Sequence, residues 1–362
     1  MKNQKKKKVN IKDIAKMAGV SYQVVSSILN KRQSTIRFSK ETERKVTEIA
    51  KDVNYRPDFF GRSLKQNKSF LVGVLGFEVN SPLFAGILMG MQEIMIPRDH
   101  APLLLIHNSA KSENDNFLTA MDRKVDALIV NTYIASGSDK QTDIYADMIS
   151  QGFPIVELMG LGIEGVPKVA PDFRDMARIA CRRLIGMGHT RIVHVTHDRY
   201  DASLRHQGES WDAWMLSLGY KDAMQEAGLR EEIIRQQLPP TPMVTPREWI
   251  AGGRPIARKI LADKTVTAVF TYADFQSYSF MMEAEEKGMK VPRDLSLVCV
   301  GSSNVYTFSD PPISTVAIDT RKVGSDAASM VLDLLDGRKT GDRFVSSSQM
   351  PGDTIAAPRS RN

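Results

Sequence analysis

The sequence lacks any apolar run of roughly 18 residues, the length that a membrane-spanning helix needs. Lysines stand at Lys2 and Lys5–Lys8, but no apolar segment follows them, which argues against a secretory signal. Cysteine is scarce: Cys181 and Cys299 each lie inside an apolar segment, without a CxxC motif or a Cys/His cluster. We therefore expect buried structural thiols in a cytoplasmic protein, with neither a disulfide nor a membrane partner.

Motifs of the common enzyme classes are also missing. The sequence contains no GxSxG motif, no Walker phosphate loop and no dinucleotide-binding glycine fingerprint. His194 and His197 have a spacing that could hold a metal on a helix, but they follow an expected strand and lack a suitable carboxylate pair. We expect no catalytic residue, no metal site and no cofactor.

The positive charge is concentrated at one end of the chain. Residues 1–68 hold 18 lysines and arginines against six acidic residues, whereas the rest of the chain holds 31 basic and 36 acidic residues. A basic head on a mildly acidic body indicates binding to a polyanion through one end. Composition alone leaves DNA, RNA and an anionic membrane surface open. We take the lysine-rich residues 1–9 as a flexible tail.

Residues 10–56 have the pattern of a helix-turn-helix domain. Asn10 can cap a first helix, Gly19 can supply the turn, and Ser21 can cap a second helix. A third helix is expected to begin at Ser39. Any small helical bundle could share this pattern, but polar side chains on the second helix could hydrogen-bond bases in the major groove. We expect these on its outer face: Tyr22, Gln23, Ser26, Ser27 and Asn30.

Two runs of residues resemble one known family. The run D-I-A-K-M-A-G-V-S-Y-Q-V-V-S-S-I-L-N from Asp13, and Y-R-P-D-F-F-G-R-S-L-K from Tyr55, are similar to the head and hinge of the lactose-repressor/galactose-repressor family. The resemblance implies that the second helix reads one half-site of a palindromic operator. It also implies that residues 57–68 hold a hinge helix that orders on DNA, with Leu64 wedged into the minor groove beside Lys65.

Two residues depart from the family pattern. Ser27 stands where an arginine is common, so we expect a different base at that operator position. Gly61 stands where alanine is usual, so we expect a hinge helix that depends unusually on DNA. Pattern and resemblance together give these candidate DNA-binding residues: Ile11, Ser21, Tyr22, Gln23, Ser26, Ser27, Asn30, Arg32, Tyr55, Leu64 and Lys65.

After Lys68 the pattern changes to alternating strands and helices, which predicts parallel sheets with helical crossovers. Expected helices are 82–96, 174–186 and 276–287. More than eight strands in this length favour two sheets in two lobes over residues 69–350, followed by a C-terminal tail at 351–362. Expected strands include 70–77, 101–107, 125–131, 154–159, 191–196, 268–272 and 295–300.

The body resembles the periplasmic-binding-protein-like sensor domain of the same family. The matching motifs are G-H-T-R-I (188–192), G-Y-K-D-A-M-Q-E-A-G-L (219–229), T-A-V-F-T-Y-A-D (267–274), V-P-R-D-L-S-L-V (291–298) and P-P-I-S-T-V (311–316). The resemblance implies three crossings between lobes, near residues 168, 302 and 320. It also implies an effector cleft at the carboxyl ends of the strands.

The candidate effector-binding residues are Asn80, Ser81, Phe84, Trp214 and Asp274. Other polar positions of the family pocket are altered, since Leu216 replaces a common basic residue and Gly301 and Ser302 replace an acidic pair. Trp211 and Trp214 could stack on a ligand, but their spacing fits core packing equally well. The ligand therefore stays open, with a sugar or sugar derivative as one candidate.

These observations predict an all-α helix-turn-helix headpiece and hinge helix, followed by a two-lobed α/β periplasmic-binding-protein-like sensor domain with parallel sheets. We expect a homodimeric transcriptional regulator that binds double-stranded operator DNA and a small-molecule effector. A repressor is favoured, with activation left open, as is the direction in which the effector acts. A regulator that has lost its ligand is one alternative. A free sugar-binding transport component is another, against which the basic head and the missing signal argue.

Overall fold

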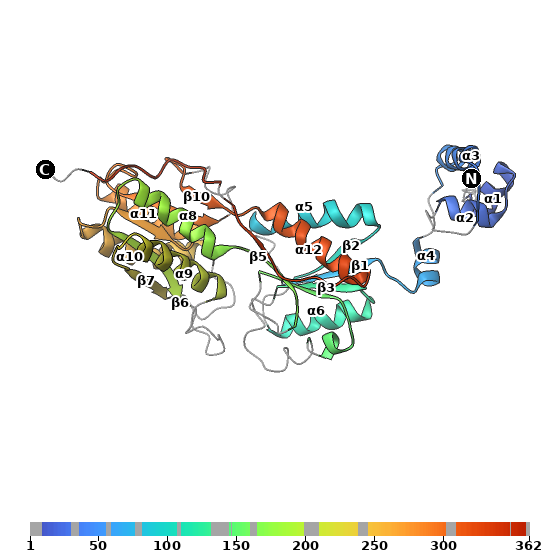
Figure 1. Cartoon of the computed structure of the whole chain (residues 1–362), viewed down its shortest axis with the longest axis horizontal. Helices are drawn as coiled ribbons and strands as arrows, with labels where there is room; N and C mark the ends of the chain where they lie inside the picture. The colour runs from blue at the N-terminus through green and yellow to red at the C-terminus, as the bar shows by residue number, and fades with distance from the viewer. Residues whose placement is uncertain are drawn as a thin grey trace, which may run out of the picture. The chain divides into compact units, whose positions relative to one another are not determined.

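The structure is a computed structural model with two compact units, Met1–Ser69 and Phe70–Asn362, which we call the head unit and the sensor unit (Figure 1). No helix among the described residues is long and apolar enough to cross a membrane. The described residues are 9–29, 36–55, 59–76, 82–106, 110–131, 145, 147–159, 165–198, 210–237, 245–301, 309–347 and 349–359.

The head unit consists of helices packed around a small apolar core. Its helices are α1 (Ile11–Ala18), α2 (Tyr22–Leu29), α3 (Lys40–Asp52) and α4 (Phe59–Gln66). Ile14, Val25 and Val46 are fully buried and join the first three helices. Because these residues recur at helical spacing in the sequence, the three-helix core was predictable, and the structure confirms it.

The sensor unit contains two parallel sheets. The first has the order β11-β5-β4-β3-β1-β2, and the second has the order β10-β9-β8-β6-β7. All their pairings are parallel, as the alternation of strands and helices predicts. The strands are β1 (Leu71–Leu75), β2 (Ala101–Leu105), β3 (Ala127–Val130), β4 (Ile155–Leu158), β5 (Lys168–Pro171), β6 (Ile192–Asp198), β7 (Ile233–Gln237), β8 (Ala268–Thr271), β9 (Ser296–Gly301), β10 (Ser314–Ala317) and β11 (Arg343–Val345).

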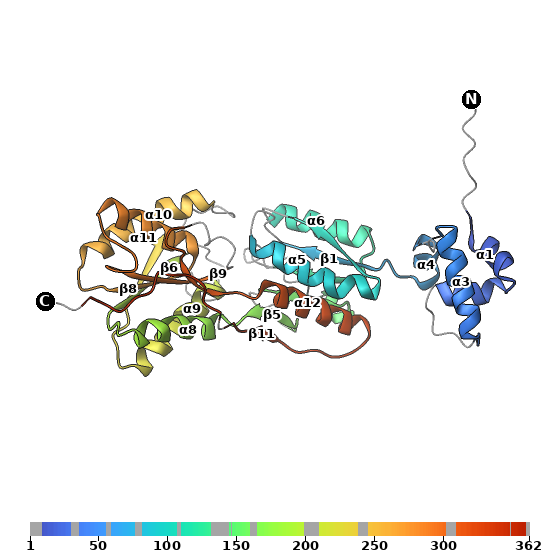
Figure 2. The same cartoon turned by 90° about the horizontal axis from the view of Figure 1, so that it is seen from above.

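Helices cover both faces of each sheet, which makes two lobes. In the C-lobe, built on the second sheet, α8 and α9 lie on one face and α10 and α11 on the other (Figure 2). In the N-lobe, built on the first sheet, α5 and α12 lie on one face and α6 on the other (Figure 2). The helices are α5 (Pro82–Met95), η1 (Ile96–Arg98), α6 (Ala110–Asp122), α8 (Phe173–Gly186), α9 (Trp211–Glu226), α10 (Pro246–Ala262), α11 (Asp274–Glu286) and α12 (Thr320–Leu335).

The chain crosses between lobes at places that differ in part from those expected. The first crossing follows β5, close to the expected residue 168. The crossing expected near 302 is wrong, because β9 and β10, on either side of it, pair within the same C-lobe sheet. The crossing expected near residue 320 is confirmed, since the chain passes there from β10 of the C-lobe to α12 of the N-lobe. A crossing that was not expected follows β11, after which the chain returns to the C-lobe.

The segment 351–359 is part of the C-lobe, which corrects its assignment to a tail. Thr354 is fully buried and exchanges hydrogen bonds with Ser314 at 2.7 and 3.0 Å. Its backbone oxygen also accepts from the N–H of Leu297 at 2.8 Å. Ala356 donates its N–H to the Ser296 hydroxyl at 3.0 Å. These partners are distant in sequence, so local pattern gave no sign of them.

Helices α5 and α12 lie unusually close because glycines stand at their crossing. A Cβ atom at Gly324 would be 1.9 Å from the carbonyl oxygen of Ile87. A Cβ atom at Gly90 would be 2.0 Å from the carbonyl oxygen of Arg321. Any larger residue would force the two backbones apart, so glycine is required at this contact.

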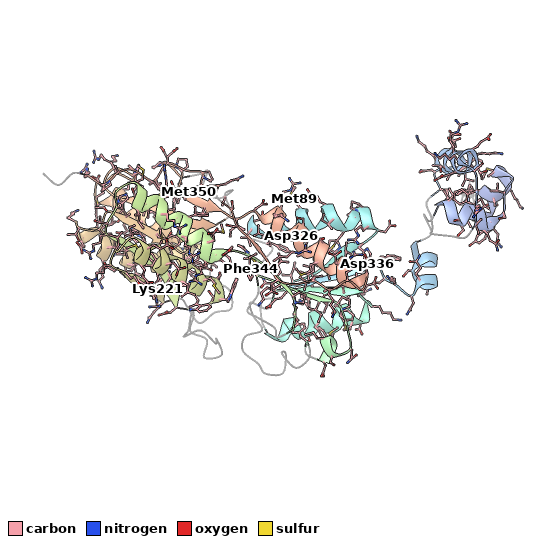
Figure 3. All side chains as sticks on the ribbon, viewed as in Figure 1. Met89, Lys221, Asp326, Asp336, Phe344 and Met350 are labelled. Atoms are coloured by element: carbon pink, nitrogen blue, oxygen red, sulfur yellow. The ribbon has the colours of Figure 1, made fainter. Side chains whose placement is uncertain are left out.

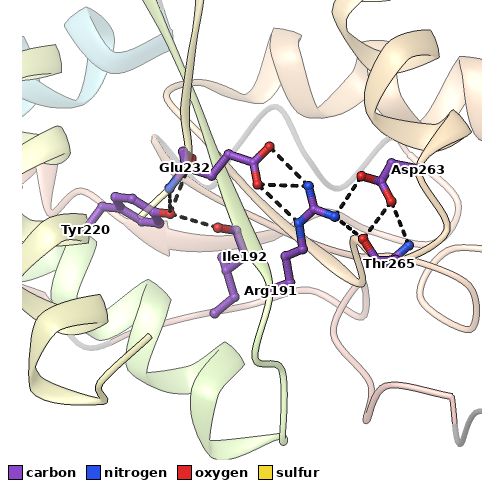
Figure 4. A network of polar contacts seen from close by, with 6 residues as sticks. All are labelled: Arg191, Ile192, Tyr220, Glu232, Asp263 and Thr265. Carbon is purple, nitrogen blue, oxygen red and sulfur yellow. Dashed lines mark hydrogen bonds and ion pairs between the residues drawn. The ribbon is translucent and has the colours of Figure 1, made fainter. Parts of the chain in front are cut away.

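The G-H-T-R-I motif (188–192) links the segments that precede the strands of the C-lobe sheet. Arg191 forms ion pairs with Glu232 at 3.1 Å and Asp263 at 2.7 Å. Tyr220 donates to the carbonyl oxygen of Ile192 at 2.8 Å and accepts from the N–H of Glu232 at 2.8 Å. The motif therefore has a structural role. Figure 4 shows this network of Arg191, Ile192, Tyr220, Glu232, Asp263 and Thr265.

Candidate DNA interface and effector site

The helix-turn-helix forms through the capping residues that the sequence predicts. The Asn10 side chain accepts from the N–H of Asp13 at 3.1 Å, and the Asp13 carboxylate accepts from the N–H of Asn10 at 2.9 Å. Gly19 has φ of 70°, the left-handed conformation that ends α1. The Ser21 hydroxyl then accepts from the N–H of Val24 at 3.3 Å at the start of α2.

The outer face of α2 is narrower than expected. Tyr22 is 46% exposed and Gln23 is exposed, while Ser26 is half-buried. Ser27 is only 4% exposed, so its expected place on the outer face is wrong. A serine side chain is also several atoms shorter than the arginine that is common at this position. Among the described residues, the Ser27 hydroxyl has no hydrogen-bond partner.

The remaining candidates in the head unit fall into three groups. Ile11 and Tyr55 are half-buried and pack against the core of the head, which limits their reach. Asn30 and Arg32 lie outside the described residues. The side chain of Lys65 also lies outside the description, although its backbone belongs to α4.

Helix α4 carries a conspicuously exposed apolar side chain. Leu64 is 84% exposed, the largest value among the exposed large hydrophobic residues of the described chain. The helix ends at Asn67, which has φ of 49°, and the Ser63 hydroxyl donates to the carbonyl oxygen of Lys68 at 2.5 Å. Leu64 is therefore held on a short, capped helix with its apolar surface in solvent.

In the sensor unit, aromatic rings gather where strands β6 and β8 end. The ring of His197 lies 4.4 Å from that of Tyr272 and 5.2 Å from that of Trp249, edge to face. Trp249 and Tyr272 stack with their centroids 5.7 Å apart. Carboxyl ends of parallel strands are the usual position of ligand sites in α/β folds. We refer to His197, Trp249 and Tyr272 as the aromatic cluster.

Polar side chains hold the aromatic cluster in place. The Tyr272 hydroxyl donates to the Asp212 carboxylate at 2.6 Å. The Gln276 side chain accepts from the N–H of Tyr272 at 3.1 Å and donates to the side-chain oxygen of Gln236 at 3.0 Å. Gln236 in turn donates to the carbonyl oxygen of Trp249 at 3.0 Å. This bracing orients rings and a carboxylate before any ligand arrives.

The predicted effector residues are only partly brought together. Asp274 begins α11 directly after β8 and is 9% exposed, and Trp214 is half-buried on α9. Phe84, on α5, packs in the apolar core of the N-lobe with 3% exposure, and its part in ligand binding stays a prediction. Asn80 and Ser81 lie outside the described residues.

The two histidines of β6 face opposite sides of the sheet. His194 contacts Tyr220 of α9, whereas His197 contacts Trp249 of α10, because residues three apart on a strand alternate faces. In the described part of the chain, no group of three or more His, Cys, Asp or Glu residues could hold a metal. In the C-lobe, the buried polar atoms without a partner among the described residues include His194 Nε2, Thr196 Oγ1 and Ser217 Oγ.

Both cysteines are buried free thiols, as the sequence predicts. Burial raises the pKa of the Cys299 thiol to about 12, and it raises the pKa of Cys181 as well. A thiol with such a pKa stays protonated and unreactive at neutral pH.

Two family models match the chain. The model described as "Bacterial regulatory proteins, lacI family" matches residues 10–58, and the model described as "Periplasmic binding protein-like domain" matches residues 181–354. Curated relatives span nearly the whole chain. The purine repressor PurR of Histophilus somni (strain 129Pt) is 28% identical over 333 residues, covering 89% of this chain and 90% of the relative. The regulator DegA of Bacillus subtilis (strain 168) is 25% identical, covering 88% and 89%.

Residues 10–58 belong to the lacI family of bacterial regulatory proteins. Solved structures agree with the fold. The lac repressor dimer bound to operator and the anti-inducer ONPF has a TM-score of 0.71 at 20% identity, covering 97% of this chain and 100% of that one. The regulator CelR in complex with cellobiose has a TM-score of 0.65 at 21% identity, covering 96% and 99%.

This lacI-family head, with relatives named as transcriptional repressors along nearly the whole chain, makes the protein a transcriptional regulator rather than an enzyme. The aromatic cluster is a part of the site that sequence reasoning missed. From the sequence alone, His197 is a candidate only for metal binding, and Tyr272 is only one letter of a family motif. The signal that could have found them is the position of both residues at the carboxyl end of an expected strand.

Proposed function

We propose that this chain binds a pseudo-palindromic operator as a homodimer and represses transcription under the control of a small molecule. In this proposal residues 10–56 bind DNA, 57–68 form the hinge, and 69–359 sense the effector. The observation that carries it is Leu64, which is 84% exposed on a capped hinge helix. Insertion of this side chain between base pairs would remove its apolar surface from water and kink the duplex.

Base recognition is assigned to the exposed side of α2. Tyr22, Gln23 and Ser26 carry hydroxyl and amide groups that can pair with base edges in the major groove. Ser27 is buried, so its contribution is to leave room at a position where a longer side chain would reach the DNA. Asn30, Arg32 and Lys65 are assigned to phosphate or minor-groove contacts, which set register rather than sequence.

A two-fold homodimer would match the two halves of a palindrome. Exposed apolar side chains on contacting elements of the N-lobe support an interface there. Met89 of α5 is 52% exposed (Figure 3), and Ile96, Leu104 and Ile106 are between 40 and 57% exposed. The similar lac repressor structure is described as a dimer bound to operator.

The effector site is assigned to the aromatic cluster together with Asp212 and Asp274. Aromatic faces stack on flat or apolar ligand surfaces, and carboxylates accept hydrogen bonds from ligand hydroxyl groups. A sugar or sugar derivative fits this chemistry. Among similar structures, one regulator is described in complex with cellobiose and one with bound ribose.

The test of DNA recognition is a selection of random duplexes with the purified full-length protein, followed by titration of the selected sequence. Leu64→Ala is compared with Gln66→Ala, an exposed position on the same helix. We expect Leu64→Ala to weaken operator binding by about tenfold or more, since a buried leucine is worth about 1.5–3 kcal/mol. Gln66→Ala should bind nearly as wild type does.

A pseudo-palindromic motif with a flexible centre would support the proposal. If no motif emerged and binding depended on salt alone, the head would be a non-specific DNA clamp. For the effector, a thermal-shift series with mono- and disaccharides compares wild type with Asp212→Asn. Saturable stabilisation that Asp212→Asn abolishes would rule out a regulator that has lost its ligand.

A further inference from the structure

A cavity lies at the edge of the C-lobe sheet where strands β6, β8 and β9 begin, away from the aromatic cluster at their carboxyl ends. Its volume is about 410 Å³, and it is lined by residues that precede strands β6, β8 and β9, and by the C-terminal segment. Because the strands are parallel, this edge and the aromatic cluster stand at opposite ends of the same sheet. The polar and charged side chains of its lining include His189, Lys264, Thr267, Arg293, Asp294 and Arg359.

The wall of the cavity is built from firmly held groups. His189 is 2% exposed, its Nε2 lies 2.8 Å from the carbonyl oxygen of Ala356, and its Nδ1 lies 2.8 Å from the Thr267 hydroxyl. Burial lowers the pKa of His189, although the bond to Ala356 opposes that shift, so the ring is neutral near pH 7. The backbone of Ala356 is held by its bonds to His189 and Ser296. The position of Arg359, three residues later in the cavity lining, is therefore restricted.

Positive charge exceeds negative charge around the cavity. Asp294 accepts from Arg293 at 2.9 Å and from Arg359 at 2.6 Å, so one carboxylate serves two guanidinium groups. Burial alone would raise the pKa of Asp294, but hydrogen bonds from Arg293 and from the Lys290 N–H, together with the charges of Arg293 and Arg359, hold it below its usual value. The Lys264 ammonium group contacts the Met289 sulfur at 4.0 Å and has no carboxylate partner in the described chain.

We infer that this cavity is a second ligand site, which takes a small phosphate-bearing molecule. Three cations against one carboxylate leave a surplus of two positive charges for a dianion. Asp294 orients both guanidinium groups, and each keeps further N–H donors of the kind that pair with phosphate oxygens. The volume lies within the range of small-molecule sites. The inference does not depend on the effector assignment at the aromatic cluster.

The test uses full-length protein without DNA, titrated calorimetrically with inorganic phosphate and pyrophosphate at constant ionic strength. Wild type is compared with Lys264→Ala and Arg359→Ala. Lys259→Ala is the matched control, because it is an exposed lysine of the same lobe outside the cavity. We expect saturable binding that each cavity variant weakens by about tenfold, as loss of a charge-assisted hydrogen bond does.

Two results would overturn the inference. One is no saturable binding of either anion up to about 10 mM, a concentration at which even weak sites fill. The other is equal affinity in wild type, both cavity variants and the control, which would indicate general attraction to a basic surface. Thermal unfolding of Arg359→Ala shows whether that variant has loosened the C-terminal segment. If it has, the phosphate affinity of Lys264→Ala, a variant outside that segment, is the deciding measurement.

Discussion

His194 should make the sensor unit lose stability as the pH falls below neutral. The side chain is fully buried in β6, with Nδ1 3.0 Å from the carbonyl oxygen of Phe270 and its ring stacked on Phe270 at 4.5 Å. Burial, with a smaller contribution from the positive charge of Arg235, lowers the pKa of His194 to about 4, although the hydrogen bond to the Phe270 carbonyl opposes the shift. The folded state therefore keeps this ring neutral under conditions in which an exposed histidine takes up a proton.

The sign of the effect follows from proton linkage. An unfolded histidine has a pKa of about 6.5, so below that pH the unfolded state binds more protons than the folded state does. The contribution of His194 is fully present above pH 6.5 and is lost as the pH falls toward 4. Between pH 7.5 and 5.5 the loss is about 1.4 kcal/mol, and its limit is about 3 kcal/mol.

The assay is urea unfolding followed by tryptophan fluorescence at a series of pH values. Trp211, Trp214 and Trp249 are the three tryptophans of the chain, and all belong to the C-lobe, so fluorescence reports on the unit that contains His194. The variant His194→Gln removes the titrating group and keeps a side chain that can donate to Phe270. The control His100→Gln removes a histidine of the N-lobe.

We expect the free energy of unfolding of wild type to fall between pH 7.5 and 5.5 by about 1.4 kcal/mol more than that of His194→Gln. A constant difference between the two proteins would reflect packing alone, so only the slope matters. Parallel pH profiles for wild type and His194→Gln, or a slope altered equally by His100→Gln, would refute the reasoning.

Three further predictions concern glycine and backbone conformation. Gly324→Ala should destabilise the sensor unit by about 2–4 kcal/mol in the urea assay, because the alanine Cβ would lie 1.9 Å from the Ile87 carbonyl oxygen. Gly186→Ala is the control: it has open space around it and should change the free energy of unfolding little. Phe70 has φ of 57°, a left-handed conformation that only glycine adopts without strain. The free energy of unfolding of Phe70→Gly should therefore exceed that of Phe70→Ala by about 1 kcal/mol in the same urea assay. The reverse order would contradict this prediction. Gly61→Ala should raise operator affinity up to about fivefold in a binding titration, because alanine favours the hinge helix by about 1 kcal/mol, and unchanged or weaker binding would count against a DNA-dependent hinge.

The parts of the fold that sequence reasoning found are those with long periodic signals. The apolar runs at 70–77 and 191–196 correspond to β1 and β6, and the helix expected at 174–186 corresponds to α8. Strands β5 (K-V-A-P), β10 (S-T-V-A) and β11 (R-F-V) lack a continuous apolar run, whereas β3, a strand of similar length that was found, reads A-L-I-V. Because these short strands flank the lobe crossings, missing them also misplaced the crossing expected near residue 302.

The candidate sites were predictable to the extent that local sequence determines them. Capping by Asn10 and Ser21 depends on neighbours within three residues, and the structure reproduces it. The aromatic cluster joins His197 to Trp249 and Tyr272, which are brought together only by the order of strands in the sheet. Ser27 was expected to face outward but is buried. Helical spacing alone did not predict this, because burial also depends on how α2 packs against the other helices.

The first turn of α9 connects the proposed effector site to the contact between the lobes. Trp211 stacks on Phe344, a residue of the N-lobe strand β11, with ring centroids 6.4 Å apart, and its ring lies 5.9 Å from that of Phe173 on α8. The next residue, Asp212, accepts the hydrogen bond from Tyr272 in the aromatic cluster. A ligand that displaced the Tyr272 hydroxyl from Asp212 would therefore act on the same helical turn that holds the lobes against each other. Coupling between two sites requires an element that both can shift. The first turn of α9 places one contact of the proposed ligand site and one interlobe contact on adjacent residues.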